Sequence, residues 1–195
     1  MEIRPLQRAE YRAAARVITE ALLDDPGWLA VGPDRRSHRR VVALRYHRTA
    51  LKVMDRWGGP VYGAFGGTGE LAGVAATFGA GRYPPPAWTF LTYVPGFLLA
   101  GPAPVVRGLR TSGVQDRGHP QDEHVFLWFL AVDPAQQRTG IGRALLARVF
   151  EDAEAPVYLD TSNPANVPYY ASFGFEEFGR AELPRGATMW FMRRP

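Results

Sequence analysis

An apolar run followed by a glycine loop and a helical pattern constrains the fold more than any other segment of this chain. Residues 125–130 carry only apolar side chains, which is typical of a strand covered on both faces. Gly140 and Gly142 follow, and the lack of a Cβ atom at each lets a ligand approach the main chain. Apolar residues then recur with the period of a helix at Ile141, Leu145 and Val149. This order predicts a buried strand that leads through a loop rich in N–H groups into a helix.

The predicted loop is suited to a phosphate or pyrophosphate. The first N–H groups of a helix have no acceptor within the helix and lie at the positive end of its dipole. The loop is not that of a nucleotide triphosphatase, because no lysine follows its glycines, nor a dinucleotide fingerprint, because that motif needs a third glycine. The pattern Gln137-x-x-Gly140-x-Gly142, after a Val-Asp-Pro strand end, resembles the coenzyme A pyrophosphate loop of the GCN5-related N-acetyltransferases.

A second motif carries the same resemblance. Asn163 is followed seven positions later by Tyr170, and Gly174-Phe175 begins four positions after this tyrosine. The same acetyltransferase family has an asparagine, a tyrosine and Gly-Phe at these separations just downstream of its pyrophosphate loop. The two motifs cover about residues 123–178. Within the family, the segments 24–26 and 183–193 resemble the branch of puromycin N-acetyltransferase.

The resemblance implies a fold and a co-substrate. The fold is α/β (α+β), with a twisted, mixed, mostly antiparallel sheet flanked by helices, and its fourth and fifth strands splay apart to seat acetyl-CoA. The main chain of Leu130, Ala131 and Val132 is then expected to pair with the pantetheine arm as an added strand would. Asn163 is expected to bind the same arm. The pyrophosphate is expected on the loop formed by Gln137, Arg138, Thr139, Gly140, Ile141, Gly142 and Arg143.

The resemblance also implies a general acid. Tyr170 is expected beside the sulfur, where a phenol with an ordinary pKa near 10 stays protonated at neutral pH and can donate to a thiolate. Tyr169 is its rival for this role, and Asn163 can instead cap the helix expected to begin near Pro164.

The general base stays open at the level of the sequence. Relatives that acetylate peptides often have a glutamate five residues before the asparagine, and Tyr158 stands at that position here. Glu123 and His124, at the start of the central strand, are the first candidates. Transfer to solvent without a dedicated base is the other alternative. Three further residues remain open as bases, namely Asp122, His119 and Asp25.

The 195 residues are expected to form one domain, 1–195, with an insertion rich in proline and aromatic residues at about 79–120. Pro95, Pro102 and Pro104 are expected to interrupt any helix in this insertion. Its apolar residues are expected either to wall a substrate pocket or to pack in the core or a dimer interface. The absence of cysteine excludes disulfides and a thiol nucleophile, and the four histidines show no spacing for a metal site.

The net charge of +4 comes almost wholly from arginine, and several arginines gather in 35–48. Apolar residues interleave with them at helical spacing, so we expect the solvated face of a helix at about 35–57 and no nucleic-acid partner. The sequence has no apolar span of 18 residues and no apolar signal core after Met1. We therefore expect a cytoplasmic protein without a membrane partner, as a monomer or homodimer.

The expected activity is transfer of an acetyl group from acetyl-CoA to a primary amine of a small molecule, directly within a ternary complex. An alkyl amine with a pKa of about 10 must first lose a proton, which costs on the order of 4 kcal/mol at pH 7. Placement of the reactants lowers the activation barrier by about 7–11 kcal/mol at best. The residues that bind the cofactor therefore contribute more to the rate than the acid–base groups do. The alternatives are a protein or peptide N-acetyltransferase and a non-catalytic acyl-CoA-binding regulatory module.

Overall fold

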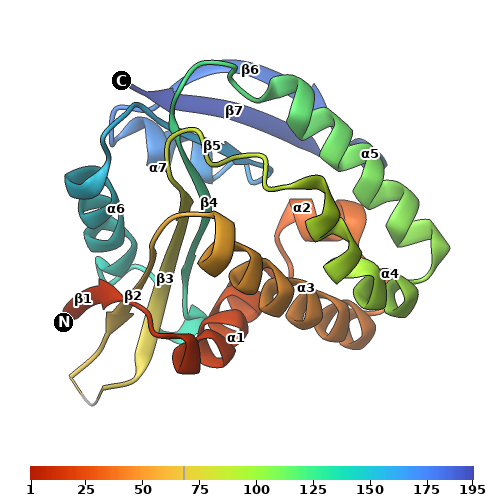
Figure 1. Cartoon of the computed structure of the whole chain (residues 1–195), viewed down its shortest axis with the longest axis horizontal. Helices are drawn as coiled ribbons and strands as arrows, with labels where there is room; N and C mark the ends of the chain where they lie inside the picture. Colours follow the sequence, from red (N-terminus) through yellow and green to blue (C-terminus); the bar gives the residue numbers. More distant parts are fainter. Residues whose placement is uncertain (68) are drawn as a thin grey trace.

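The computed structural model describes residues 1–67 and 69–195, and its centre is a twisted sheet with the strand order β1-β2-β3-β4-β5-β7-β6 (Figure 1). Every neighbouring pair is antiparallel except β4 and β5. The mixed, mostly antiparallel sheet predicted from the resemblance is therefore confirmed. The strands are β1 (Glu2–Pro5), β2 (Val61–Phe65), β3 (Leu71–Phe78), β4 (Val125–Val132), β5 (Val157–Thr161), β6 (Glu176–Glu182) and β7 (Thr188–Arg194).

Helices cover both faces of the sheet. The α-helices are α1 (Tyr11–Leu22), α2 (Pro26–Val31), α3 (Arg36–Trp57), α4 (Val94–Ala100), α5 (Pro102–Gly118), α6 (Ile141–Asp152) and α7 (Asn166–Ala171). Short 3-10 turns are η1 (Arg8–Glu10), η2 (Ala87–Tyr93), η3 (Pro134–Gln136) and η4 (Pro184–Gly186). Figure 1 shows α1 and α3 on one side of the sheet and α6 on the other. Two apolar cores result, one under α1 and α3 and one under α6.

A β-bulge in β4 changes which face its side chains reach. Val125 and Leu127 lie in the core under α6, whereas Phe126 and Phe129 lie in the core under α1 and α3. Strict alternation would put Phe129 with Leu127, but the pairing with β3 skips Trp128. The extra residue re-aims the strand just before its open segment.

The parallel strands β4 and β5 separate soon after they meet. They pair only at Val125 with Val157 and at Phe126 with Tyr158, although both strands continue beyond these residues. The later part of β4 pairs with β3 alone, so its other edge carries main-chain groups that β5 does not bond. This is the splay that the resemblance implies.

The insertion is more helical than its prolines predict. It forms η2, α4 and the long helix α5, so the expectation that proline interrupts helices here is wrong. Pro95 and Pro102 instead lie in the first turns of α4 and α5, where the missing N–H group has no partner to lose. Arg107 of α5 donates to the carbonyls of Val31 and Gly32 and so holds the insertion against the end of α2.

The arginine-rich segment forms α3 as predicted, but one of its arginines is not solvated. Arg39 is buried, and it donates to the carbonyls of Leu23 and Pro33 and to the carboxylate of Asp24. A buried guanidinium needs such a full set of acceptors, which the chain around α2 supplies. Among the described residues, no helix is long and apolar enough to cross a bilayer.

Candidate active site

The loop between β4 and α6 adopts the conformation that concentrates N–H groups. Arg138 and Gly140 both have left-handed backbones, with φ of 64° and 92°. The side chains of Gln137 and Thr139 are bonded within the loop, to the carbonyls of Val132 and Gln136. The main chain rather than these side chains is therefore left to face a ligand. The N–H groups of the first turn of α6 add to it, because they have no acceptor within the helix.

The side chain of Tyr169 leaves no room for a Cβ atom at Gly142. A Cβ atom at this position would lie 2.9 Å from the hydroxyl oxygen of Tyr169. The Tyr169 ring packs edge-on against Phe173, with 5.0 Å between the ring centroids, and the guanidinium of Arg143 lies over Phe173. Tyr169 therefore supports the first turn of α6, a place distinct from that of Tyr170.

Tyr170 lies in the core under α6 and is only 8% exposed. Its ring packs edge-on against Phe175, with 5.7 Å between the centroids. Burial raises the pKa of Tyr170, and the nearby carboxylates of Asp25 and Asp160 raise it further. The phenol therefore holds its proton at neutral pH, as a general acid must.

Asn163 joins the turn after β5 to the start of α2. Its side-chain oxygen accepts from the N–H of Ala165 at 3.1 Å, and its side chain lies near enough to Asp25 to lower the pKa of that carboxyl group. Burial raises the pKa of Asp25, and the hydrogen bond from the Gly27 N–H and the nearby Asn163 side chain partly offset this. The helix expected to begin near Pro164 begins at Asn166 instead, so Asn163 forms the turn before α7.

The base candidates at the start of β4 are engaged elsewhere or exposed. Glu123 is exposed to solvent, while the Nε2 atoms of His124 and His119 lie 2.9 Å apart in a buried pair. Burial and the neighbouring His124 lower the pKa of His119 to about 4. All of them precede Val125, at the end of the sheet where β4 and β5 are still paired, and not where the strands open.

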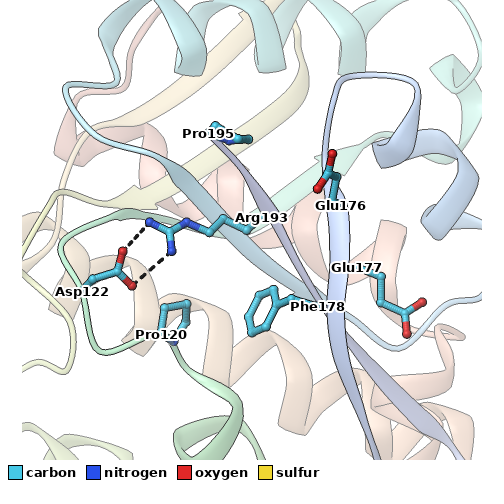
Figure 2. A pocket seen from close by; sticks show the side chains of 7 residues that line it. All are labelled: Pro120, Asp122, Glu176, Glu177, Phe178, Arg193 and Pro195. Carbon is cyan, nitrogen blue, oxygen red and sulfur yellow. Dashed lines mark hydrogen bonds and ion pairs between the residues drawn. The ribbon is translucent and has the colours of Figure 1, made fainter.

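Asp122 is held by an ion pair at the same end of the sheet. Figure 2 shows its carboxylate facing the guanidinium of Arg193. Both residues line a pocket of about 420 Å³, together with Phe178. The ion pair lowers the pKa of Asp122. A carboxylate that is both paired and made less basic is poorly suited to take a proton from an amine.

Asp160 on β5 is a candidate that the sequence analysis missed. It lies two residues beyond the last β5 residue that pairs with β4, and therefore where the strands open. Its Oδ2 accepts from Gln115 of α5 at 2.7 Å and from the Tyr158 hydroxyl at 3.4 Å. Burial raises the pKa of Asp160 to about 6. A carboxylate within a strand of apolar residues was the signal available in the sequence.

Aromatic side chains from several elements pack beside the opening. Tyr46 of α3 contacts Trp28, Tyr93 and Trp128, with 5.5, 5.4 and 6.4 Å between ring centroids. Tyr93 comes from the insertion, and Tyr83 of the same segment packs in the core against Phe126 of β4. Burial raises the pKa of Tyr46, and the negative charge of Asp160 on β5 raises it further.

The profile of the Acetyltransferase (GNAT) family matches residues 57–175, more than half of the chain. This chain belongs to the GNAT family of acetyltransferases. The match contains β4, the loop and both motif residues Asn163 and Tyr170. Family membership places the chain among the acetyltransferases and does not identify its acceptor.

Solved structures of other family members share the whole fold. A histone acetyltransferase HPA2 and related acetyltransferase from Corynebacterium glutamicum has a TM-score of 0.74 at 20% identity, over 99% of this chain and 94% of that one. Arylalkylamine N-acetyltransferase 2 from Aedes aegypti has a TM-score of 0.65 at 12% identity, over 99% and 97%. Ribosomal-protein-alanine N-acetyltransferase from Brucella melitensis has a TM-score of 0.62 at 20% identity, over 100% and 99%. At such identities the likeness establishes the fold alone.

A curated relative shares part of the sequence. An uncharacterised protein of Mycobacterium leprae is 34% identical over 89 residues, which is 43% of this chain and 25% of that protein. The chain thus spans about a quarter of the length of this relative. Within the part of the chain that the structure describes, no group of three or more acidic or histidine side chains is arranged to hold a metal ion.

Proposed function

We propose that this protein transfers an acetyl group from acetyl-CoA to a primary amine of a small molecule, directly in a ternary complex. The observation that carries the proposal is the open edge of β4, which runs into a loop of N–H groups and is flanked by Tyr170 and Asp160. An extended ligand with amides at one end and a pyrophosphate at the other is complementary to this arrangement.

The described residues fit acetyl-CoA, which when bound supplies the acetyl thioester. Leu130, Ala131 and Val132 are bonded to β3 on one side only and offer main-chain groups to the pantetheine amides on the other. The loop from Gln137 to Arg143 offers its N–H groups to the pyrophosphate. Asn163 lies in the turn after β5, where its amide can reach the pantetheine arm.

In the proposed mechanism Tyr170 donates a proton to the departing thiolate. Its raised pKa keeps the phenol protonated until that thiolate forms. Among the described residues, no hydrogen-bond partner engages its hydroxyl, which is therefore free to face the sulfur.

We assign the base to Asp160 in place of Glu123 and His124. With a pKa of about 6, this carboxyl group is mostly ionised at pH 7 and yet more basic than an ordinary aspartate. The hydrogen bond from Gln115 holds one of its oxygens in place. The other oxygen is then available to take a proton from the amine, directly or through a water molecule.

The packing beside the opening favours a small acceptor over a protein. Rings of Trp28, Tyr46 and Tyr93 pack together beside Trp128 of β4, and Tyr93 comes from the insertion. A peptide acceptor is the second candidate, since a ribosomal-protein-alanine N-acetyltransferase shares the fold, as an arylalkylamine N-acetyltransferase does.

The test is release of free thiol from acetyl-CoA with a panel of amines. Small aliphatic and arylalkyl amines are expected to be turned over with kcat/KM at least tenfold above that of peptides with free N-termini. Equal or higher kcat/KM values with peptides would contradict the proposal and favour a peptide N-acetyltransferase. No thiol release with any amine, despite binding of acetyl-CoA, would favour the regulatory module.

A further inference from the structure

A groove lined with arginine crosses the outer surface of α1 and α3. It has a volume of about 940 Å³, and we call it the basic groove. Arg8, Arg12 and Arg16 line it from η1 and α1. Arg45, Arg48, Lys52 and Arg56 line it from α3. Trp88 of η2 also lines it, against Trp57 at the end of α3.

The cations form two facing rows, because α1 and α3 run antiparallel. Arg8 and Tyr11 bond Asp55 near the end of α3, at 2.6 and 3.1 Å, whereas Glu20 bonds Arg40 near its start. Four residues of an α-helix rise about 6 Å, so each row repeats its charge at about this distance. The row on α3 extends over about 16 Å. A repeating line of charge suits a chain-like anion better than a single phosphate group.

The positive charge of the basic groove is hardly neutralised by the protein. Asp55 is the one acidic residue among the described residues that line it, and Arg8 already bonds this carboxylate. For the other six cations of the two rows, no carboxylate of the described residues lies within 4 Å. Like charges held together in this way repel one another and raise the local concentration of anions.

Aromatic rings accompany the two rows. Trp57 and Trp88 meet edge-on with 5.9 Å between ring centroids, and the Arg56 guanidinium lies 5.7 Å from the ring centre of Trp57. Trp88 is 54% exposed, so its ring is open to solvent beside these cations. Exposed aromatic rings beside a line of cations are the combination on which unpaired bases stack.

The basic groove is separate from the proposed acetyl-transfer site. It lies on the outside of the helices that cover one face of the sheet, whereas the loop begins α6 on the other face. Arg8 follows β1 where Pro5 pairs with Tyr62 near the start of β2, whereas the loop follows Val132, which pairs with Gly73 near the start of β3.

We propose that the basic groove binds single-stranded nucleic acid. The rows of cations would follow the phosphates, and the ring of Trp88 would stack on a base. A second copy of this chain is excluded as the occupant of a two-fold contact, since it would bring the same cations face to face. An acidic peptide would match the charges but would leave the exposed tryptophan unexplained. The helical spacing of 35–57 predicts a solvated face for Arg45 and Arg48, and the fold adds the row on α1 that faces them.

The test uses the full chain and a fluorescent twelve-nucleotide oligothymidylate, with anisotropy read at 50 to 200 mM salt. Four phosphate contacts predict a slope of log K against log salt of about −2.8, which is an affinity loss of about 50-fold over this range. Replacing both Arg12 and Arg48 by alanine is expected to weaken binding at least tenfold and to reduce the slope by about 1.4. Trp88→Ala is expected to weaken it at least fivefold through lost stacking.

The matched control is Arg110→Ala, an exposed arginine outside the basic groove, which is expected to leave binding unchanged. Circular dichroism of each variant checks that it is folded. Equal affinity for polyglutamate with no effect of Trp88→Ala would overturn the proposal in favour of an acidic peptide. Equal affinity for ATP and for the oligothymidylate would overturn the proposal in favour of a site for a free nucleotide. Absence of oligonucleotide binding at 50 mM salt would leave these cations as a solvated face.

Discussion

The Tyr169 hydroxyl lies 2.9 Å from the point that a Cβ atom of residue 142 would occupy. Gly142 therefore couples the ring that supports α6 to the loop proposed to hold the pyrophosphate. The two glycines of the loop serve different needs, since Gly140 has a left-handed backbone and nothing described lies within 4 Å of its Cβ position. One glycine sets the path of the chain, and the other makes room for a side chain.

Gly142→Ala is expected to push Tyr169 away and to distort the first turn of α6. Overpacking of this kind destabilises a protein by about 1–3 kcal/mol. We expect acetyl-CoA affinity to fall about tenfold in calorimetric titration. Because the clash is with the hydroxyl, Gly142→Ala combined with Tyr169→Phe is expected to recover most of the loss. An unchanged affinity in the single variant would remove Gly142 from the cofactor site.

Tyr170→Phe is expected to lower kcat by about 10²–10⁴-fold, the usual contribution of a positioned general acid. Acetyl-CoA affinity is expected to change less than threefold, since the ring and its packing on Phe175 are retained. The matched control is Tyr169→Phe, which removes the neighbouring hydroxyl and should keep kcat within a few fold. A larger loss of kcat in Tyr169→Phe than in Tyr170→Phe would assign the general acid to Tyr169.

Asp160→Asn is expected to change the shape of the pH profile of kcat/KM. The ordinary amine pKa of about 10 makes log kcat/KM rise with a slope of one across neutral pH. Asp160, with a raised pKa of about 6, gains a proton below this pH and can no longer accept one. The wild-type slope should therefore approach two below pH 6, while the variant keeps a slope of one at a lower rate. Identical slopes in both proteins would show that solvent takes the proton.

His47 is expected to make the fold sensitive to acid. Complete burial lowers the pKa of His47 from its ordinary 6.5 to about 3. Between these values the unfolded chain binds a proton that the folded chain does not, so stability falls as the pH falls. The unfolding free energy of His47→Gln relative to wild type should rise by about 1.4 kcal/mol per pH unit from pH 6 to pH 4. A difference that does not vary with pH in denaturant titrations would contradict this.

Much of the fold follows from local patterns that the sequence displays. β4, the loop and α6 come from one continuous stretch, and α3 from its helical spacing, so each is visible before any tertiary contact is known. The splay of β4 and β5 was predicted from the family resemblance alone, because no local sequence pattern indicates where two strands distant in the sequence separate.

The parts that the sequence could not provide depend on distant neighbours. Burial raises the pKa of Asp160, and Gln115, 45 residues away in the chain, fixes one of its oxygens by a hydrogen bond that partly offsets this rise. Glu123 and His124 were predicted as bases because they precede the central strand. Their position in the sequence does not determine at which end of the sheet β4 and β5 separate. Arg39 is similar, because its acceptors on Leu23 and Asp24 become neighbours only when α2 folds.

The central claim is that the open edge of β4 and its loop bind acetyl-CoA, and a thermal melt with and without this ligand tests it most directly. At a concentration of one hundred times the dissociation constant, binding stabilises the folded state by about 2.7 kcal/mol. For a chain of this size the melting temperature should then rise by about 5–10 °C with acetyl-CoA and also with free coenzyme A. No rise at millimolar concentrations of either ligand would contradict the account.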